Sequence, residues 1–273
     1  MSALRLVHPF PSFLNSALVF ALATLAGGGT DRAALLAAGM LGMQFCIGVV
    51  NDLVDESVDR AAKPWKPIAA GIVSRRAAWT VAAVAGGGGF VCAALCGPLI
   101  ALMWLAMLSC GLLYDLRLKP TAWAWLCFSI AFTILPVYAW YGAAGQLPPR
   151  TEFLLPLAFL AGPLIALSNG LPDLEADTVT GVPTLARRLG RRRTLAAIAA
   201  LLLVIYGLAW ITLADESITS LGPVAFASTF AAMGLIFLAQ PQVATRQRGW
   251  VMQAIAIALL GLAWVSVVGS PAA

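Results

Sequence analysis

Charged residues are scarce in this sequence. Only 29 of the 273 residues are charged, 17 basic and 12 acidic, and they make up 11% of the chain, against about a quarter in an average soluble domain. Hydrophobic residues make up 61%, and the mean hydropathy is +0.90. The 29 charged residues are too few to form the charged surface that a soluble domain of this size needs. The composition therefore excludes an ordinary soluble enzyme, a disordered protein and a nucleic-acid-binding domain.

Cysteine and histidine are also sparse. The five cysteines all fall within apolar stretches and form no Cys-x-x-Cys pair, so the sequence indicates neither a zinc site nor a redox motif. We interpret them as small buried apolar residues. The single histidine, His8, precedes the first apolar stretch. There we expect an interfacial or helix-capping role rather than that of a general base.

The charges divide the chain into long uncharged stretches. A helix needs about 20 apolar residues to cross a bilayer, and each stretch has about that length or more. The stretches are 6–30, 33–51, 77–114, 120–149, 153–172, 194–214, 217–245 and 249–273. The stretch 77–114 is long enough for two helices, with Gly97-Pro98 as a natural break. The sequence therefore predicts an all-α, polytopic membrane protein with nine transmembrane helices and one domain over residues 1–273.

The basic residues predict the orientation of these helices. With nine crossings, 15 of the 17 basic residues fall on one side, and only Arg32 and Arg150 fall on the other. Basic residues are enriched on the cytoplasmic side of membrane proteins. We therefore expect the N-terminus to be cytoplasmic.

Within the stretch 77–114, Gly86–Gly89 could allow close helix packing or form a hinge, and the sequence does not decide between these.

The acidic residues are clustered. Seven of the twelve lie in two short segments on the expected cytoplasmic side, and both segments have the spacing Asn-x-x-x-Asp-x-x-x-Asp. The repeated positions, 118 residues apart, are Asn51, Asp55 and Asp59 in the first and Asn169, Asp173 and Asp177 in the second. On a helix, Asp52, Asp55 and Asp59 would fall within about 60° of one another. Each cluster would therefore present its carboxylates on one face, and oxygen ligands at this density favour Mg²⁺.

Basic residues follow each acidic cluster. Lys63 and Lys66 come after the first, and Arg187, Arg188 and Arg191–Arg193 come after the second. For Arg191–Arg193 we favour a role in topology alone. Mg²⁺ commonly bridges one or two carboxylates to a phosphate group, so carboxylates, a metal ion and nearby cations together indicate a diphosphate site.

At these residues the sequence resembles the UbiA superfamily of intramembrane prenyltransferases, of the 4-hydroxybenzoate polyprenyltransferase type. The family's first motif, Asn-Asp-x-x-Asp-x-x-x-Asp, is matched by residues 51–59, and its continuation towards a glycine by residues 63–71. Residues 173–185 resemble the pattern Asp-x-Glu-x-Asp…Gly-x-x-Thr-Leu, and residues 5–9 resemble the family's start. One motif departs: the family's Tyr-x-x-x-Lys is here Tyr114-x-x-x-x-Lys119, with Arg117 three residues after the tyrosine.

The resemblance implies a helical bundle around a central cavity and Mg²⁺-dependent prenyl transfer. An allylic prenyl diphosphate would bind with its headgroup between the second and sixth helices, and a lipophilic acceptor would attack the allylic cation. The implied metal ligands and catalytic residues are Asp52, Asp55, Asp59, Asp173 and Asp177. The implied diphosphate-binding residues are Asn51, Asn169, Lys63, Lys66, Tyr114, Arg117 and Lys119. We expect this site to face the cytoplasm, in the cell's inner (plasma) membrane.

Other functions remain open from the sequence. A terpene cyclase on the same scaffold would use the same metal and diphosphate residues. A cation or small-molecule transporter is disfavoured, because the acidic residues lie at expected helix ends rather than at the membrane midplane. We expect an aromatic or quinone precursor as acceptor. The second motif also looks like that of enzymes acting on naphthoate, homogentisate, chlorophyllide or glycerol-phosphate lipids, and it specifies neither the prenyl chain length, nor a general base, nor the oligomeric state.

Overall fold

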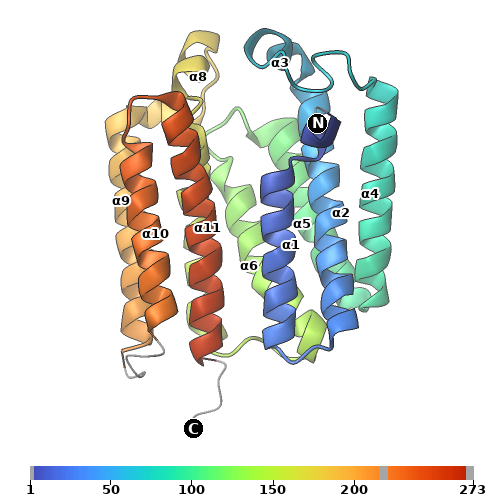
Figure 1. The fold of residues 1–273 in the computed structure, drawn as a ribbon, viewed down its shortest axis with the longest axis vertical. Helices are drawn as coiled ribbons and strands as arrows, with labels where there is room; N and C mark the ends of the chain where they lie inside the picture. The colour runs from blue at the N-terminus through green and yellow to red at the C-terminus, as the bar shows by residue number, and fades with distance from the viewer. Residues whose placement is uncertain (1–2, 215–220, 269–273) are drawn as a thin grey trace. The chain divides into compact units, whose positions relative to one another are not determined.

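The computed structural model describes residues 3–214 and 221–268, and every regular element in these ranges is helical (Figure 1). This confirms the expected all-α class. The longer helices are α1 (Pro9–Leu25), α2 (Thr30–Val54), α4 (Arg75–Leu95), α5 (Pro98–Leu113), α6 (Trp125–Ala144), α7 (Thr151–Gly170), α9 (Leu185–Thr212), α10 (Gly222–Leu238) and α11 (Val243–Val268). The short elements are η1 (Ala3–Val7), α3 (Glu56–Ala62), the π-helical turn η2 (Tyr114–Leu118) and α8 (Leu174–Thr180).

Seven helices of the described ranges are long and apolar enough to cross a membrane, with α5 counted together with η2. The helices α1 and α10 are also apolar but have only 17 residues each. A helix of that length measures about 26 Å, slightly less than the hydrocarbon core of a bilayer. The predicted break is confirmed: α4 ends at Leu95, α5 begins at Pro98, and Gly97 between them has a φ of +124°.

The chain forms two compact units. The first comprises Met1–Arg117 and Ile134–Gln146, and the second comprises Leu118–Thr133 and Leu147–Ala273. The first unit thus contains η1, α1 to α5 and the second half of α6, and the second contains the first half of α6 and α7 to α11. Each aspartate motif lies within one unit.

Glycines bring α2 and α4 close together in the first unit. A Cβ atom on Gly42 would lie 2.8 Å from the Cα of Gly89, a separation that real Cβ atoms essentially never show, so this approach requires glycine at position 42. Gly89 belongs to the run Gly86–Gly89, which continues α4 without a break, so its role is close packing rather than a hinge. A buried hydrogen bond joins α5 to α2, because the Trp104 indole donates to the Gly39 carbonyl at 2.7 Å.

Close backbone approach and polar side chains also hold the second unit. A Cβ atom on Gly249 of α11 would lie 2.7 Å from the backbone nitrogen of Leu238 in α10. The buried Tyr206 hydroxyl of α9 lies 3.2 Å from the Ala227 carbonyl and 3.1 Å from the Ala256 carbonyl. Such hydrogen bonds satisfy polar groups where no water is available.

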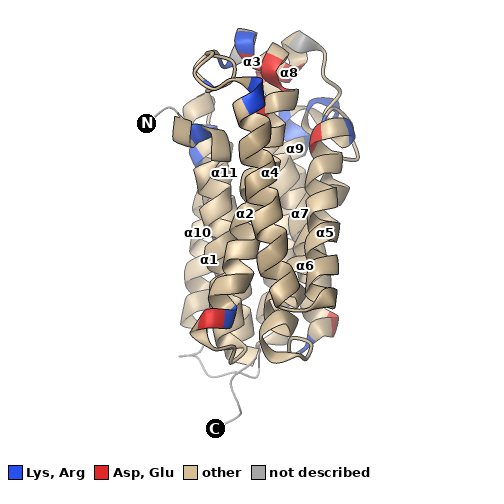
Figure 2. Ribbon diagram, turned by 90° about the vertical axis from the view of Figure 1, so that its right-hand side faces the viewer, with Lys and Arg blue, Asp and Glu red and all other residues tan. Residues whose placement is uncertain are grey.

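Charged residues lie near the ends of the long helices, and the central turns carry none (Figure 2). In α2, for example, Asp31 and Arg32 lie in the first turn and Asp52 in the last. This distribution suits helices whose middle turns face lipid or other helices. It places both aspartate motifs at helix ends.

Candidate active site

The first aspartate motif lies where a long helix gives way to a short one. The helix α2 ends at Val54, Asp55 occupies the junction, and α3 begins at Glu56. Backbone hydrogen bonds run through this junction, because the Asp55 N–H donates to the Asn51 carbonyl at 2.9 Å and the Asp59 N–H to the Asp55 carbonyl at 2.8 Å. The motif therefore keeps a helical spacing although α2 itself has ended.

The second motif repeats this arrangement. The helix α7 ends at Gly170, Asp173 is the N-cap residue of α8, and the Asp177 N–H donates to the Asp173 carbonyl at 2.8 Å. Pro172, which has no N–H to donate, lies in the break. We expected each motif to present its carboxylates on one helical face, and the structure adds that each motif spans the end of a long helix and the start of a short one. In both motifs the aspartate at the middle position of the repeat, Asp55 or Asp173, directly precedes a seven-residue helix.

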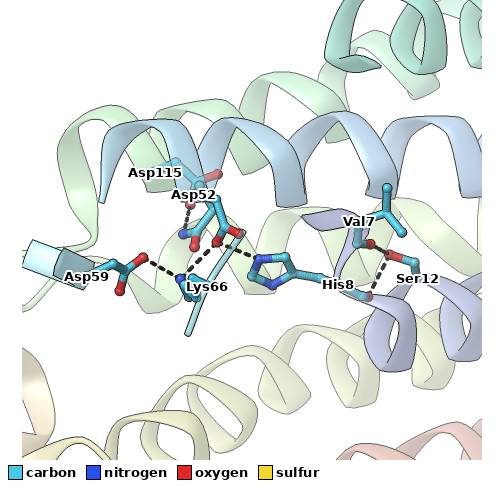
Figure 3. A network of polar contacts seen from close by, with 8 residues as sticks. Val7, His8, Ser12, Asp52, Asp59, Lys66 and Asp115 are labelled. Carbon is cyan, nitrogen blue, oxygen red and sulfur yellow. Dashed lines mark hydrogen bonds and ion pairs between the residues drawn. The ribbon is translucent and has the colours of Figure 1, made fainter. Parts of the chain in front are cut away.

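Lys66 joins two carboxylates of the first motif (Figure 3). Its ammonium nitrogen lies 2.8 Å from Oδ1 of Asp52 and 2.6 Å from Oδ2 of Asp59. Both aspartates are buried, with 2% and 4% of their surfaces exposed. The turn after α3 returns Lys66 to the motif, with the Lys66 N–H donating to the Lys63 carbonyl at 3.0 Å. The structure thus brings together three of the predicted site residues.

Burial and pairing act in opposite directions on Lys66. Burial alone would lower the pKa of its ammonium group, but hydrogen bonds and charge interactions with Asp52 and Asp59 outweigh this effect and hold the pKa above its ordinary value. Lys66 is therefore charged at neutral pH. It balances part of the negative charge that the two carboxylates place at the end of α2.

His8 contacts the same cluster. Its Nε2 lies 2.9 Å from Oδ1 of Asp52 (Figure 3), although it is the N-cap residue of α1 and makes no side-chain capping bond there. Its backbone is left-handed, with a φ of +47°, and the buried Ser12 hydroxyl donates to the Val7 and His8 carbonyls. Of the two expected roles, a side-chain cap on α1 is therefore not formed, and the turn instead directs the ring towards Asp52. The resemblance of residues 5–9 to the family's start was the only signal for it.

Asn51 also has a partner in its own unit. Its amide nitrogen donates to Oδ1 of Asp115, which is buried in η2, at 2.7 Å. This contact links the last turn of α2 to the π turn that follows α5. Among the predicted residues, Tyr114 and Arg117 belong to this turn, with Tyr114 half-buried and Arg117 exposed.

The π turn coincides with the departure from the family's spacing. A π helix takes up more residues per turn than an α-helix, and η2 covers Tyr114–Leu118, directly before Lys119. The one additional residue between Tyr114 and Lys119 therefore lies in a turn that accommodates it. Lys119 itself is half-buried.

Glu56 is held on a different surface of the first unit. It forms ion pairs with Arg60 and Arg75, and hydrogen bonds from these two arginines lower the pKa of its carboxyl group. Glu56, Arg60 and Arg75 line a hollow of about 460 Å³. Asp52, Asp59 and Lys66 do not line it. A carboxylate with a lowered pKa is a weak base, so this contact disfavours Glu56 as a proton acceptor.

In the second motif, Asp177 accepts a hydrogen bond from the Thr184 hydroxyl at 3.0 Å. Thr184 is the N-cap residue of α9 and its hydroxyl also accepts from the Arg187 N–H at 3.4 Å. Asp173, Asp177 and Asn169 are all half-buried. Thr184 was not predicted as a site residue, although it is the threonine of the Gly-x-x-Thr-Leu pattern.

An arginine holds the second motif from α11. Arg246 is 1% exposed and forms an ion pair with Glu175, the glutamate between the two aspartates, whose side chain is 58% exposed. Arg246 also donates to the Pro241 carbonyl at 2.8 Å, and its buried Nε has no hydrogen-bond partner in the described part of the chain. Arg246 is one of the 15 basic residues that predict the orientation, and nothing in the sequence relates it to Glu175, 71 positions away.

A second arginine supports the turn that carries Arg246. Arg191 of α9 donates to the Ala239 and Gln240 carbonyls, both at 2.7 Å. These carbonyls end α10 and lead to α11. We interpreted Arg191 as a topology signal only, and the structure adds this contact.

The metal ligands were predicted as a set of five aspartates, three in the first unit and two in the second. Asp52 and Asp59 meet at Lys66, while no three His, Cys, Asp or Glu side chains in the described ranges are grouped to hold an ion. One oxygen is nevertheless suited to a cation. Oδ2 of Asp52 is buried, and no hydrogen-bond donor of the described residues reaches it.

Comparison with known proteins relates this chain to one family. A sequence model of the UbiA prenyltransferase family matches residues 13–255. Digeranylgeranylglyceryl phosphate synthase of Archaeoglobus fulgidus is 34% identical over 155 residues, covering 56% of this chain and 52% of the relative. The probable homogentisate phytyltransferase 2 of Oryza sativa is 29% identical over 169 residues, covering 58% and 44%. The matched segments thus span about half the length of these relatives.

A solved structure shows the same fold. The UbiA homolog from Archaeoglobus fulgidus bound to DMAPP and Mg²⁺ superimposes with a TM-score of 0.73 at 20% sequence identity, covering 98% of this chain and 100% of that one. The long apolar helices and the family match together indicate an integral membrane protein. Because the family model covers most of the sequence, the chain belongs to the UbiA prenyltransferase family.

Proposed function

We propose that this protein transfers a prenyl group from an allylic prenyl diphosphate to a lipophilic acceptor within the membrane and releases diphosphate. The observation that carries the proposal is the pair of aspartate motifs, each at a break between a long and a seven-residue helix, in a member of the UbiA family. The motifs supply carboxylates and the segments that follow supply cations. That combination suits a metal-bound diphosphate.

The carboxylates fit Mg²⁺. They are hard oxygen ligands, and the buried Oδ2 of Asp52, which has no hydrogen-bond partner among the described residues, can accept a cation. A related solved structure holds DMAPP together with Mg²⁺. We propose as ligands Asp52, Asp55, Asp59, Asp173 and Asp177. When bound, Mg²⁺ would stabilise the negative charge that develops on the leaving diphosphate.

The chain's own polar residues would bind and orient the diphosphate. The residues that we propose for this role are Asn51, Asn169, Lys63, Lys66, Tyr114, Arg117 and Lys119. Of the two cations after Tyr114, we favour Lys119, because it is half-buried and Arg117 is exposed. The apolar side chains of the surrounding helices would exclude water from the allylic cation.

The membrane arrangement is also part of the proposal. The seven long apolar helices together with α1 and α10 would give nine crossings, with the N-terminus and both motifs on the cytoplasmic side of the plasma membrane. Maleimide labelling of single cysteines placed at Arg150 and Arg188 in sealed vesicles would test this. Labelling of both positions from the same side would contradict it.

The acceptor that we propose is an aromatic or quinone precursor. One relative is named a probable homogentisate phytyltransferase and another a digeranylgeranylglyceryl phosphate synthase. The family therefore includes both aromatic and glycerol-phosphate acceptors. Mass spectrometry of lipids from cells with and without the gene would identify the missing product. Loss of a prenylated glycerol phosphate alone would contradict an aromatic acceptor.

The central test removes one carboxylate from each motif. We expect Asp55→Asn and Asp173→Asn each to lower prenyl transfer in Mg²⁺-supplied membranes by at least about 100-fold. The matched control is Asp31→Asn at the opposite end of α2. Wild-type turnover in either motif variant would refute the proposed site, and a cyclic hydrocarbon formed from geranylgeranyl diphosphate without acceptor would indicate a cyclase instead.

A further inference from the structure

Lys66 lies between two carboxylates of the first motif that the proposed function assigns to Mg²⁺. Its ammonium group contacts carboxylates from two elements, Asp52 at the end of α2 and Asp59 in α3, at 2.8 and 2.6 Å. Its side chain is only 17% exposed. The two carboxylate groups that Lys66 contacts belong to residues that the proposed function assigns to Mg²⁺, so the two cations compete for the same side chains.

We propose that Lys66 is a resident counter-cation that makes metal binding at the first motif depend on the diphosphate. A divalent ion alone would have to displace the ammonium group from both carboxylates and leave it without an anion. A metal ion that arrives with a diphosphate brings a new anion for the displaced ammonium group. This inference rests on the proposed function and adds an order of binding to it.

The charges at the cluster support this order. Two carboxylates and one ammonium group leave a net charge of about −1 before His8 is counted, which attracts a divalent ion less strongly than two free carboxylates would.

The surroundings allow Lys66 to leave while Asp52 stays in place. Lys66 carries its charge on a flexible four-carbon chain and lies in the turn that follows α3, next to the exposed Trp65. Asp52 is held separately, because Oδ1 also contacts His8 at 2.9 Å (Figure 3). Its second oxygen, Oδ2, is buried and has no hydrogen-bond partner among the described residues.

Binding of metal and diphosphate must then be coupled in both directions. The displaced lysine favours the diphosphate, and the diphosphate favours the metal by removing the lysine from the carboxylates. Replacing Lys66 by an uncharged side chain should therefore have two opposite effects. It should strengthen binding of a metal ion alone and reduce the increase in metal affinity that the diphosphate causes.

The experiment measures binding of Mn²⁺, as a paramagnetic substitute for Mg²⁺, to the full-length protein in nanodiscs by electron paramagnetic resonance, with and without inorganic diphosphate. In the wild type we expect inorganic diphosphate to tighten Mn²⁺ binding by at least about ten-fold. In Lys66→Met we expect Mn²⁺ alone to bind at least about ten-fold tighter than in the wild type. The added effect of inorganic diphosphate should shrink by a similar factor.

Two variants serve as controls. Lys66→Arg keeps the charge and should keep weak Mn²⁺ binding in the absence of diphosphate. Arg76→Met removes the same charge from an exposed position in the first turn of α4 and should behave as the wild type. Thermal unfolding of each variant shows whether it is folded, and Lys66→Gln replaces Lys66→Met if the latter is not.

The outcomes separate this inference from the proposed function. Equal Mn²⁺ binding by Lys66→Met and the wild type without diphosphate would overturn the counter-cation role, even if diphosphate still tightens binding. If inorganic diphosphate does not tighten Mn²⁺ binding to the wild type, the proposed diphosphate site itself fails. Tighter binding of Mn²⁺ alone by Arg76→Met as well would reduce the effect to overall charge and also overturn the inference.

Discussion

The two aspartate motifs share a backbone arrangement but differ in how their charge is balanced. In the first motif, Lys66 contacts the aspartates Asp52 and Asp59 directly. In the second, Arg246 pairs with the intervening glutamate, Glu175, from a neighbouring helix. Lys66 therefore contacts proposed metal ligands directly, whereas Arg246 contacts a glutamate that lies between two of them in the sequence.

The two cations also differ in chemical type, and this difference fits the groups that each one contacts. A lysine ammonium group is compact and flexible, whereas a buried arginine with a planar guanidinium group is held in one orientation. Arg246 also donates to the Pro241 carbonyl, which fixes it to the turn before α11. The comparison suggests that the first motif has an exchangeable cation and the second a fixed one.

The largest expected effect is the loss of stability when a buried aspartate of the first motif is removed, compared with a half-buried aspartate of the second. Asp52→Ala removes a buried carboxylate and leaves Lys66 and His8 with fewer partners, so it should abolish activity and lower the free energy of unfolding by about 3 kcal/mol. Asp177→Ala, at a half-buried position, should abolish activity with a smaller loss of stability. Activity assays and thermal unfolding in detergent measure both, and equal losses of stability would contradict the comparison.

A smaller effect is expected when the fixed cation is removed. Arg246→Met should raise the Mg²⁺ concentration for half-maximal activity by about ten-fold, because Glu175 no longer holds α8 in place. The apolar methionine fills the buried position, so stability should change little or even rise. The measurement is the Mg²⁺ dependence of turnover together with thermal unfolding.

Two further variants show whether Arg246 acts through Glu175. Glu175→Gln should reproduce the effect of Arg246→Met, and the double variant should be no worse than either single one. Arg248→Met, at an exposed position two residues away, is the matched control. Additive effects would indicate that Arg246 acts by another route.

The smallest expected effect concerns His8. His8→Asn keeps a residue that tolerates the left-handed backbone but is too short to reach Asp52, so kcat/KM should fall by about fivefold. His8→Gln, which restores a donor at a similar distance, should recover most of this loss. A larger loss in His8→Gln than in His8→Asn would mean that the Asp52 contact is not what His8 contributes.

The sequence predicted the helical class and several boundaries because those depend on local signals. The break at Gly97-Pro98 needed only a glycine and a proline. The position of both motifs at helix ends followed from the spacing of charges along the chain. The break at each middle aspartate was not predicted, because the i, i+4 spacing is the same whether or not the long helix continues.

The contacts that the sequence could not predict join distant positions. Lys66 was predicted as a diphosphate ligand, but its place between Asp52 and Asp59 depends on how the turn after α3 folds back. Arg246 reaches Glu175 across 71 positions, and charge counting could use it only for topology. Such pairings arise from packing between helices, which residue spacing within one segment does not encode.

The lysine between the two aspartates also bears on how this part of the chain reaches the membrane. Two carboxylates at the end of an apolar helix would be costly to bury during insertion if they carried no counter-charge. Lys66 follows Asp59 by seven residues, so the chain brings its own cation from the same stretch of newly made polypeptide. Assembly of this helix end therefore does not have to wait for a metal ion, unlike the folding of domains that a structural metal holds together.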